Sequence, residues 1–148
     1  MGRRYAVCAQ DTCTAATTQV GLTSAATIRP KIYDLIVGSD AAPDDQSSEF
    51  VLQRYTVAGT STAFTPIALD PADPASLASA GYNHSAEPTY TAAALLLEWA
   101  MNQRATFRWC AVPGGEIVLP ATAANGAGIQ TITTSTGFNT NFTIHYEE

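Results

Sequence analysis

The feature that most constrains the fold of this chain is a set of short alternating runs separated by turn sequences. The clearest is RATFRWCAVPGGEIVLP (104–120), in which Phe107 and Trp109 alternate with Arg108 and Cys110 before Pro-Gly-Gly interrupts the run. Alternation with a period of two is typical of a strand with one buried face, and Pro-Gly-Gly favours a turn. The pattern predicts a β-hairpin at this place.

Similar runs, rich in β-branched and aromatic residues, recur along most of the chain. They cover residues 3–9, 27–39, 49–59, 61–69, 128–136 and 139–148, with turn compositions such as DAAPDDQ and ATAANGAG between them. About eight short strands with intervening turns are typical of an antiparallel sandwich or a jelly roll. We therefore expect an all-β fold, one domain over residues 1–148, with one long Pro-rich loop.

Two interpretations compete for residues 91–101, TAAALLLEWAM. Their alanines, leucines and Glu98 are good helix formers, so propensity alone favours a helix. A period of two, however, places Leu95, Leu97, Trp99 and Met101 on one face, as a strand requires. We predict a strand, followed by a turn at residues 100–103.

The N-terminal segment, residues 1–26, has weak periodicity. RRYAVCA is compatible with a first strand, but QDTCTAATTQVGLTSAA has few large apolar residues to pack. We expect residues 1–26 to form an N-terminal arm or an edge segment. Arg3 and Arg4 are a basic pair that would either dock on an acidic partner or remain solvated.

Residues 65–89, TPIALDPADPASLASAGYNHSAEPT, are too rich in proline for a regular strand and too polar for a core. A polar loop of this length inside a compact domain is uncommon unless it is used, and its prolines reduce the entropy lost on ordering. We expect this loop either to contact sibling subunits or a larger assembly, or to serve as a surface crossover that joins two sheets.

Charge and cysteine content restrict the partners. Charged residues make up 14% of the chain, the net charge is −6 and Lys31 is the single lysine, so no basic surface for nucleic acid is expected. The sequence shows no apolar signal peptide and no run long enough to span a membrane, and its three cysteines form a poor disulfide framework. We expect a protein made in a cytoplasm, with no membrane partner and buried cysteines.

No catalytic or metal-binding pattern stands out. There is no GxSxG motif, His84 falls in the polar loop, and His145 alternates in the last run, so both histidines are expected to be incidental surface residues. Cys8 and Cys13 lie too far apart for a zinc knuckle, and neighbouring aspartates such as Asp70 and Asp73 are typical of turns. We expect no enzyme activity, no catalytic residues, no metal and no cofactor.

Two stretches carry a family resemblance. Residues 38–76 combine Gly38-Ser39, Gly59-Thr60, Leu69-Asp70-Pro71 and Asp73-Pro74, and residues 102–126 contain NQRATFRWCAVPGGEIVLPATAANG. Together they resemble small virion structural proteins of tailed bacteriophages, most of all the head decoration, or cement, proteins. The resemblance implies a jelly-roll subunit, often a homotrimer, on the outer capsid surface, where it bridges major capsid subunits without catalysing a reaction.

The expected contact residues lie at the N-terminus and in the Pro-rich loop. They are Arg3, Arg4, Pro66, Asp70, Pro71, Asp73, Pro74, Tyr82 and Tyr90. Two other functions stay open. The first is a tail or fibre-associated module that binds a glycan or receptor, with Tyr82 and Tyr90 as its exposed aromatic residues. The second is a hydrolase, which would need His84, His145 and acidic residues in one pocket.

Overall fold

The computed structural model describes residues 2–134 and 137–148 and contains strands without helices in these ranges. It has twelve strand segments there, rather than about eight: β1 (Arg4–Cys13), β2 (Thr17–Thr23), β3 (Lys31–Ala41), β4 (Ser47–Val57), β5 (Thr60–Phe64), β6 (Ile67–Ala68), β7 (Ser79–Ala86), β8 (Thr89–Asn102), β9 (Thr106–Cys110), β10 (Ile117–Val118), β11 (Gly126–Thr133) and β12 (Phe138–Glu147). No helix in the described ranges has the length and apolarity needed to cross a membrane.

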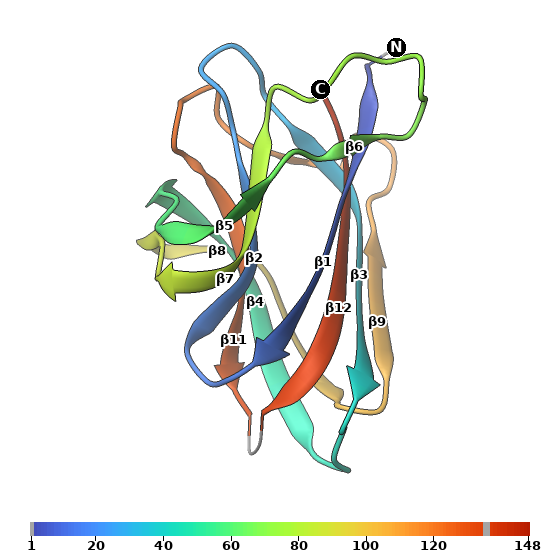
Figure 1. Cartoon of the computed structure of the whole chain (residues 1–148), viewed down its shortest axis with the longest axis vertical. Helices are drawn as coiled ribbons and strands as arrows, with labels where there is room; N and C mark the ends of the chain where they lie inside the picture. The colour runs from blue at the N-terminus through green and yellow to red at the C-terminus, as the bar shows by residue number, and fades with distance from the viewer. Residues whose placement is uncertain (1, 135–136) are drawn as a thin grey trace.

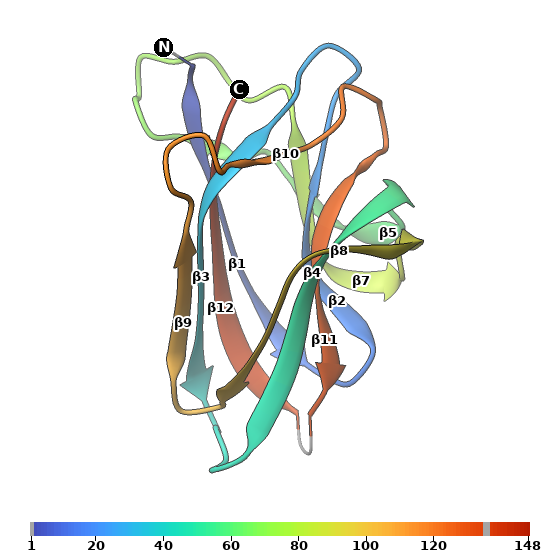
Figure 2. The ribbon, with the colours of Figure 1, turned by 180° about the vertical axis from the view of Figure 1, so that it is seen from behind.

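The strands form two antiparallel sheets that face each other (Figures 1 and 2). Sheet A has the order β10-β3-β12-β1-β6, with β9 also paired to β3, and sheet B has the order β5-β7-β2-β11-β4-β8. Large apolar residues from both sheets fill the space between them, including Tyr5, Leu22, Phe50 and Ile144. The predicted all-β class and the antiparallel sandwich are therefore confirmed.

Eight of the strands form four nested pairs, in which each pair lies further inward along the chain than the one before. The first and last, β1 and β12, pair in sheet A, and β2 pairs with β11 in sheet B. Further inward along the chain, β3 pairs with β9 and β4 pairs with β8. The same pairing results when one long antiparallel hairpin folds so that its successive strand pairs lie alternately in the two sheets.

Within residues 2–26, β1 and β2 are strands of the sandwich, so this segment does not form a loose arm. In β2, Val20 and Leu22 are fully buried, and the strand lies between β11 and β7. In β1, Tyr5 and Val7 are fully buried, and only two residues pair with β6, so most of β1 does form a sheet edge. Within residues 10–26, the fully buried Cys13, Val20 and Leu22 provide the packing that the composition did not indicate.

The predicted hairpin at residues 104–120 does not form. Both β9 and β10 pair with the same edge of β3: Thr106–Cys110 lies opposite Asp34–Gly38, and Ile117–Val118 lies opposite Lys31–Ile32. The chain therefore continues in one direction along β3, and residues 111–116 bulge outward in a turn closed by the Gly115 amide and the Val112 carbonyl oxygen at 2.8 Å. The Pro-Gly-Gly residues turn the chain away from β3 and back to it, and do not connect two paired strands, because β3 offers a longer unpaired edge than β9 does.

Residues 91–101 form a strand, as predicted, within β8. The turn that follows leads to the opposite sheet, so β8 and β9 are not a hairpin either. In β12, Phe142, Ile144 and Tyr146 share the buried face as predicted. The expected strand at 128–136 corresponds to β11, and its last two residues lie outside the described ranges.

Candidate functional site

The irregular part of the expected loop is shorter than predicted. Residues 79–86 form β7, which pairs with β2 and β5, so the irregular chain ends at residue 78. We call residues 65–78 the proline segment. It leaves β5 at the edge of sheet B, pairs briefly with β1 through β6, and returns to sheet B, near both chain termini (Figure 1). Within one subunit it is thus a crossover between the two sheets.

The last residue of the chain holds the proline segment in place. The Glu148 side-chain carboxylate accepts hydrogen bonds from the Ser76 hydroxyl at 2.6 Å, the Ala78 amide at 3.0 Å and the Leu77 amide at 3.2 Å. Hydrogen bonds to an ionised carboxylate are stronger than neutral ones. Three of them converge on one turn, so the segment is ordered by its own chain.

Buried tyrosines support the same turn from the core side. The Tyr5 hydroxyl donates to the Pro74 carbonyl oxygen at 3.2 Å, and the Tyr146 hydroxyl lies 2.6 Å from the Ser76 hydroxyl. Burial raises the pKa of Tyr146, and burial is also the first cause that raises the pKa of Tyr5. Both hydroxyls therefore remain protonated at neutral pH and can donate.

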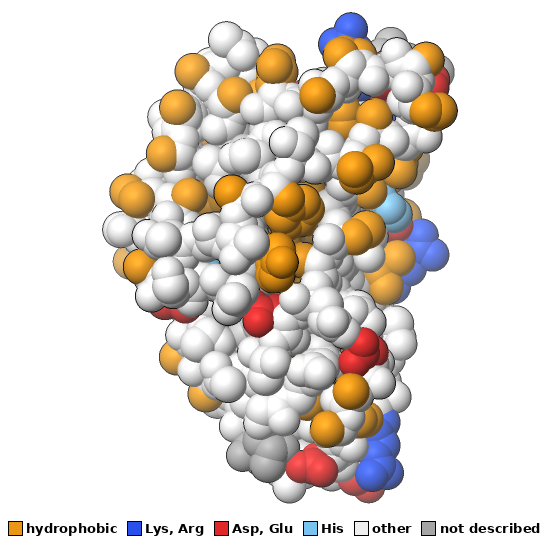
Figure 3. Space-filling view, viewed as in Figure 1, with side chains coloured by type: hydrophobic (Ala, Val, Ile, Leu, Met, Phe, Trp, Pro, Cys, Tyr) orange, Lys and Arg blue, Asp and Glu red, His pale blue; other side chains and the backbone are white. Residues whose placement is uncertain are grey.

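The ordered segment presents large apolar side chains to solvent. Ile67 is 71% exposed, Leu77 is 60% exposed and Leu69 is 49% exposed. Figure 3 shows hydrophobic side chains scattered over this face of the molecule, some of them at the end that carries both termini. An exposed apolar surface on a rigid segment is typical of a protein-binding site, because little conformational entropy remains to be lost on docking.

Most of the predicted contact residues lie at this end. Arg3 approaches Asp73 at 3.7 Å, and the Asp70 carboxylate accepts a hydrogen bond from the Ala72 amide at 2.9 Å. Pro71 and Pro74 are exposed. Arg4 also lies at this end, where its carbonyl oxygen accepts a hydrogen bond from the Leu69 amide at 2.8 Å, and its guanidinium lies 5.8 Å from the centre of the Tyr33 ring. Pro66 is placed differently, because it is buried.

The two predicted tyrosines are not part of this surface. Tyr82 packs edge-on against Phe64, with ring centroids 5.9 Å apart, and Tyr90 packs edge-on against Tyr55 at 6.1 Å. Both tyrosines are half-buried, so the expectation of exposed aromatic residues is wrong. The sequence interpretation also missed Ile67, Leu69 and Leu77, whose only signal was isolated large apolar residues in a polar loop. No sequence pattern indicated a role for Glu148.

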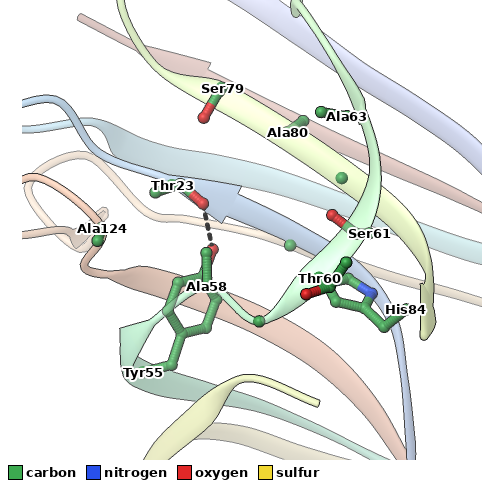
Figure 4. Close-up of a pocket in the computed structure, with 13 residues that line it drawn as sticks. Thr23, Tyr55, Ala58, Thr60, Ser61, Ala63, Ser79, Ala80, His84 and Ala124 are labelled. Atoms are coloured by element: carbon green, nitrogen blue, oxygen red, sulfur yellow. Dashed lines mark hydrogen bonds between the residues drawn. The ribbon is translucent and has the colours of Figure 1, made fainter. Parts of the chain in front are cut away.

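A groove on the outer face of sheet B is a second candidate site. The groove has a volume of about 380 Å³ and is lined by residues of β2, β4, β5 and β7 and by the short β4–β5 connection, Ala58 and Gly59 (Figure 4). Glycines 21 and 81 form part of its floor, and hydroxyl side chains line its walls, including the Thr23–Tyr55 pair at 2.7 Å. The groove can offer hydrogen bonds to a small polar ligand.

The two histidines lie on different sheets. His84 belongs to β7, not to a loop, and lines the groove, where burial lowers its pKa. His145 belongs to β12 and contacts the Asp34 carboxylate at 3.1 Å. The Arg108 guanidinium makes two 2.9 Å hydrogen bonds to that carboxylate and is the first cause that lowers the pKa of Asp34. His84 and His145 therefore do not share a pocket.

The cysteines are only partly as expected. Cys13 is buried, but Cys8 and Cys110 are exposed on the outer face of sheet A, because they occupy outward positions of β1 and β9. Among the described residues, no three His, Cys, Asp or Glu side chains gather closely enough to hold a metal ion.

Replacing Glu148 by glutamine is expected to loosen the proline segment without unfolding the sandwich. The change removes the charge that strengthens three hydrogen bonds, each worth about 1.5–3 kcal/mol when the acceptor is ionised. Amide hydrogen exchange at Leu77 and Ala78 should accelerate at least about tenfold. The matched control is Glu147→Gln, which removes only long ion pairs to Arg4 and Lys31. Unchanged exchange in Glu148→Gln would show that this carboxylate does not order the segment.

Searches of protein-family models, of curated proteins and of solved structures find no significant match to this chain.

Proposed function

We propose that this chain is a non-enzymatic virion structural protein that decorates the outside of a tailed-phage capsid and bridges major capsid subunits. It would be made in the host cytoplasm and bind the assembled shell as a homo-oligomer, with a trimer favoured by the family resemblance. The observation that carries the proposal is the proline segment, whose exposed Ile67, Leu69 and Leu77 are held in one conformation by Glu148.

We also infer that the sandwich is a jelly roll. The supporting observation is the nested pairing of β1 with β12, β2 with β11, β3 with β9 and β4 with β8. Jelly rolls have eight strands in two sheets and are common in capsid proteins. The proline segment, β5, β6 and β7 then form an insertion between the fourth and fifth strands, which is where a jelly roll can vary without disturbing its core.

Physical chemistry supports a decorating role for such a segment. A protein bound in many copies needs only a modest binding energy at each junction, so a small apolar surface is sufficient. The proline segment is stiff before binding, which reduces the entropy lost on docking. The low charge of the chain also limits the cost of removing ions from water at the junctions.

The proposal is tested by counting copies of the chain in purified virions by quantitative mass spectrometry. A copy number close to that of the major shell protein, or a simple fraction of it, is the expected result. Shells stripped of the chain should then rebind the wild-type protein and Val112→Asp, which alters an exposed residue elsewhere, but not Leu69→Asp. Absence from the particle would refute the proposal, and equal rebinding of Leu69→Asp would refute the proline segment as the contact.

A second function is favoured by the groove on sheet B. Its hydroxyl lining and glycine floor suit a small saccharide, as in a tail or fibre module that binds a glycan or receptor. A few copies per particle, together with binding to a glycan array that Ser61→Trp abolishes by filling the groove, would support this function over decoration.

A further inference from the structure

Strand β8 is an unusually long sheet edge. It has 14 residues and ends the order of sheet B, and no strand of the described ranges pairs with its other side (Figure 2). The other strands at the ends of the two sheets, β5, β6, β9 and β10, have 5, 2, 5 and 2 residues, and β1, which is free beyond its two-residue pairing with β6, has 10. Short edge strands limit pairing between molecules, and β8 lacks this protection.

The second half of β8 is regular enough to accept another strand. From Leu97 to Asn102 it pairs with β4 without any register shift, whereas the first half contains bulges. In this regular half, Glu98, Ala100 and Asn102 point outward and are exposed, while Trp99 and Met101 point into the core. An unbroken row of backbone donors and acceptors is best satisfied by a second extended strand.

The charges at this edge indicate what that strand is. Glu98 is the one charged residue of β8, and Arg104 lies in the turn directly after it. Among the described residues, neither side chain makes an ion pair within 4 Å, although each is exposed. The edge thus carries one unpaired acid and one unpaired base, six residues apart, and is complementary to an antiparallel copy of itself.

We propose that the regular half of β8 pairs with β8 of a second copy of this chain, antiparallel and around a two-fold axis at Ala100. In an antiparallel pair, opposite residues point to the same face, so Ala100 opposite Ala100 places Glu98 opposite Asn102. Glu98 of each copy then faces the end of the other strand, where Arg104 lies in the turn just beyond Asn102, within reach of long side chains. Two such ion pairs form, and the small Ala100 side chains allow the backbones to approach.

Two other registers are less favourable. Centring the axis on Glu98 would place two carboxylates directly opposite each other, which is destabilising. A slip of one residue in the pairing would place Trp99 opposite Ala100, so that an inward side chain faces an outward one. This slip would break the continuity of the two cores. The register centred on Ala100 joins the two copies of sheet B into one continuous sheet.

This contact does not depend on the proposed capsid role, because it belongs to the isolated chain. If the β8 contact is the sole contact between copies, the chain forms a dimer. If the chain also forms trimers through a three-fold contact, the β8 contact joins two trimers into a hexamer. The test is sedimentation velocity of the purified full chain over a range of concentrations. A dimer or hexamer is expected, and a species that remains monomeric or trimeric throughout would overturn the proposal.

Variants identify the strand and the register. Ala100→Lys places two like charges at the axis and should weaken association at least about tenfold, which halves the mass. Val112→Lys, at a 71% exposed position between β9 and β10, which both pair with β3 in sheet A, is the control and should leave the mass unchanged. An even-numbered assembly that Ala100→Lys does not affect would also overturn the proposal. Circular dichroism checks that each variant is folded.

A charge exchange tests the ion pairs directly. Glu98→Arg and Arg104→Glu should each weaken association, because each creates like-charged neighbours, and the double variant should restore it. Failure of the double variant to restore association would overturn the ion pairs between Glu98 of one copy and Arg104 of the other. Virion copy number plays no part in these measurements, so failure of this proposal and failure of the proposed function are distinguishable.

Discussion

Replacing Trp99 by alanine is expected to lower the free energy of unfolding by about 3–5 kcal/mol. Trp99 is 8% exposed and stacks on Phe107 with ring centroids 4.6 Å apart and planes 7° from parallel. It also stacks on Phe50 at 5.7 Å. Because Trp99 lies in sheet B and Phe107 in sheet A, this stack closes the sandwich where β8 passes to β9.

The measurement is urea unfolding followed by far-ultraviolet circular dichroism, which does not depend on tryptophan fluorescence. Domains are typically stable by about 5–15 kcal/mol, so Trp99→Ala should remove a large share of the total. Trp99→Phe is the control. The Trp99 indole nitrogen is buried without a partner among the described residues, so phenylalanine keeps most of the stacking and loses no hydrogen bond. Equal destabilisation by both variants would contradict the stacking argument.

Replacing Gly126 by alanine is expected to lower the free energy of unfolding by about 2–3 kcal/mol, or more. A Cβ atom at Gly126 would overlap the Leu22 carbonyl oxygen of the neighbouring strand and lie 2.6 Å from the Tyr55 hydroxyl oxygen. Neither can move easily, because Tyr55 is buried and its hydroxyl is bonded to Thr23. Burial also raises the pKa of Tyr55 to about 12, so this hydroxyl stays protonated.

Gly114→Ala is the matched control for Gly126→Ala. Gly114 has a φ of +81°, but a Cβ atom there would meet nothing within 4 Å. Its replacement therefore costs only backbone strain, about 1–2 kcal/mol for a left-handed residue. Unfolding of both variants in urea compares a steric clash with strain alone. A cost for Gly126→Ala no larger than that for Gly114→Ala would contradict the close approach of Tyr55 and Leu22.

Alternation along single strands could be predicted from the sequence because it depends only on neighbours in the chain. Phe142, Ile144 and Tyr146 were assigned to one face and are buried. The same rule would have placed Cys110 outward, opposite Phe107 and Trp109, and the expectation that it is buried ignored this. In β4, both faces are buried around Val51 and Leu52, which no period of two could have indicated.

Part of the candidate site was predicted for the same local reason. Prolines and aspartates in the segment 65–78 marked an irregular, stiff surface, and Arg3, Asp70 and Asp73 do lie at this end. Glu148 could not be found, because its partners lie 70–72 residues away in the sequence. The exposure of Ile67 and Leu77 could not be found either, since apolar residues in a loop are as often buried as exposed.

The sequence by itself determined that this chain is built from strands, which face of β12 and of the second half of β8 is buried, and where the stiff irregular segment lies. Only the tertiary structure decided which strands are neighbours. It placed β9 and β10 along the same edge of β3, brought β1 and β2 into the two sheets, and fixed the proline segment against Glu148. The physical reason is that a two-residue period specifies a face, whereas pairing depends on backbone hydrogen bonds and packing between distant segments, which every strand can offer to several partners.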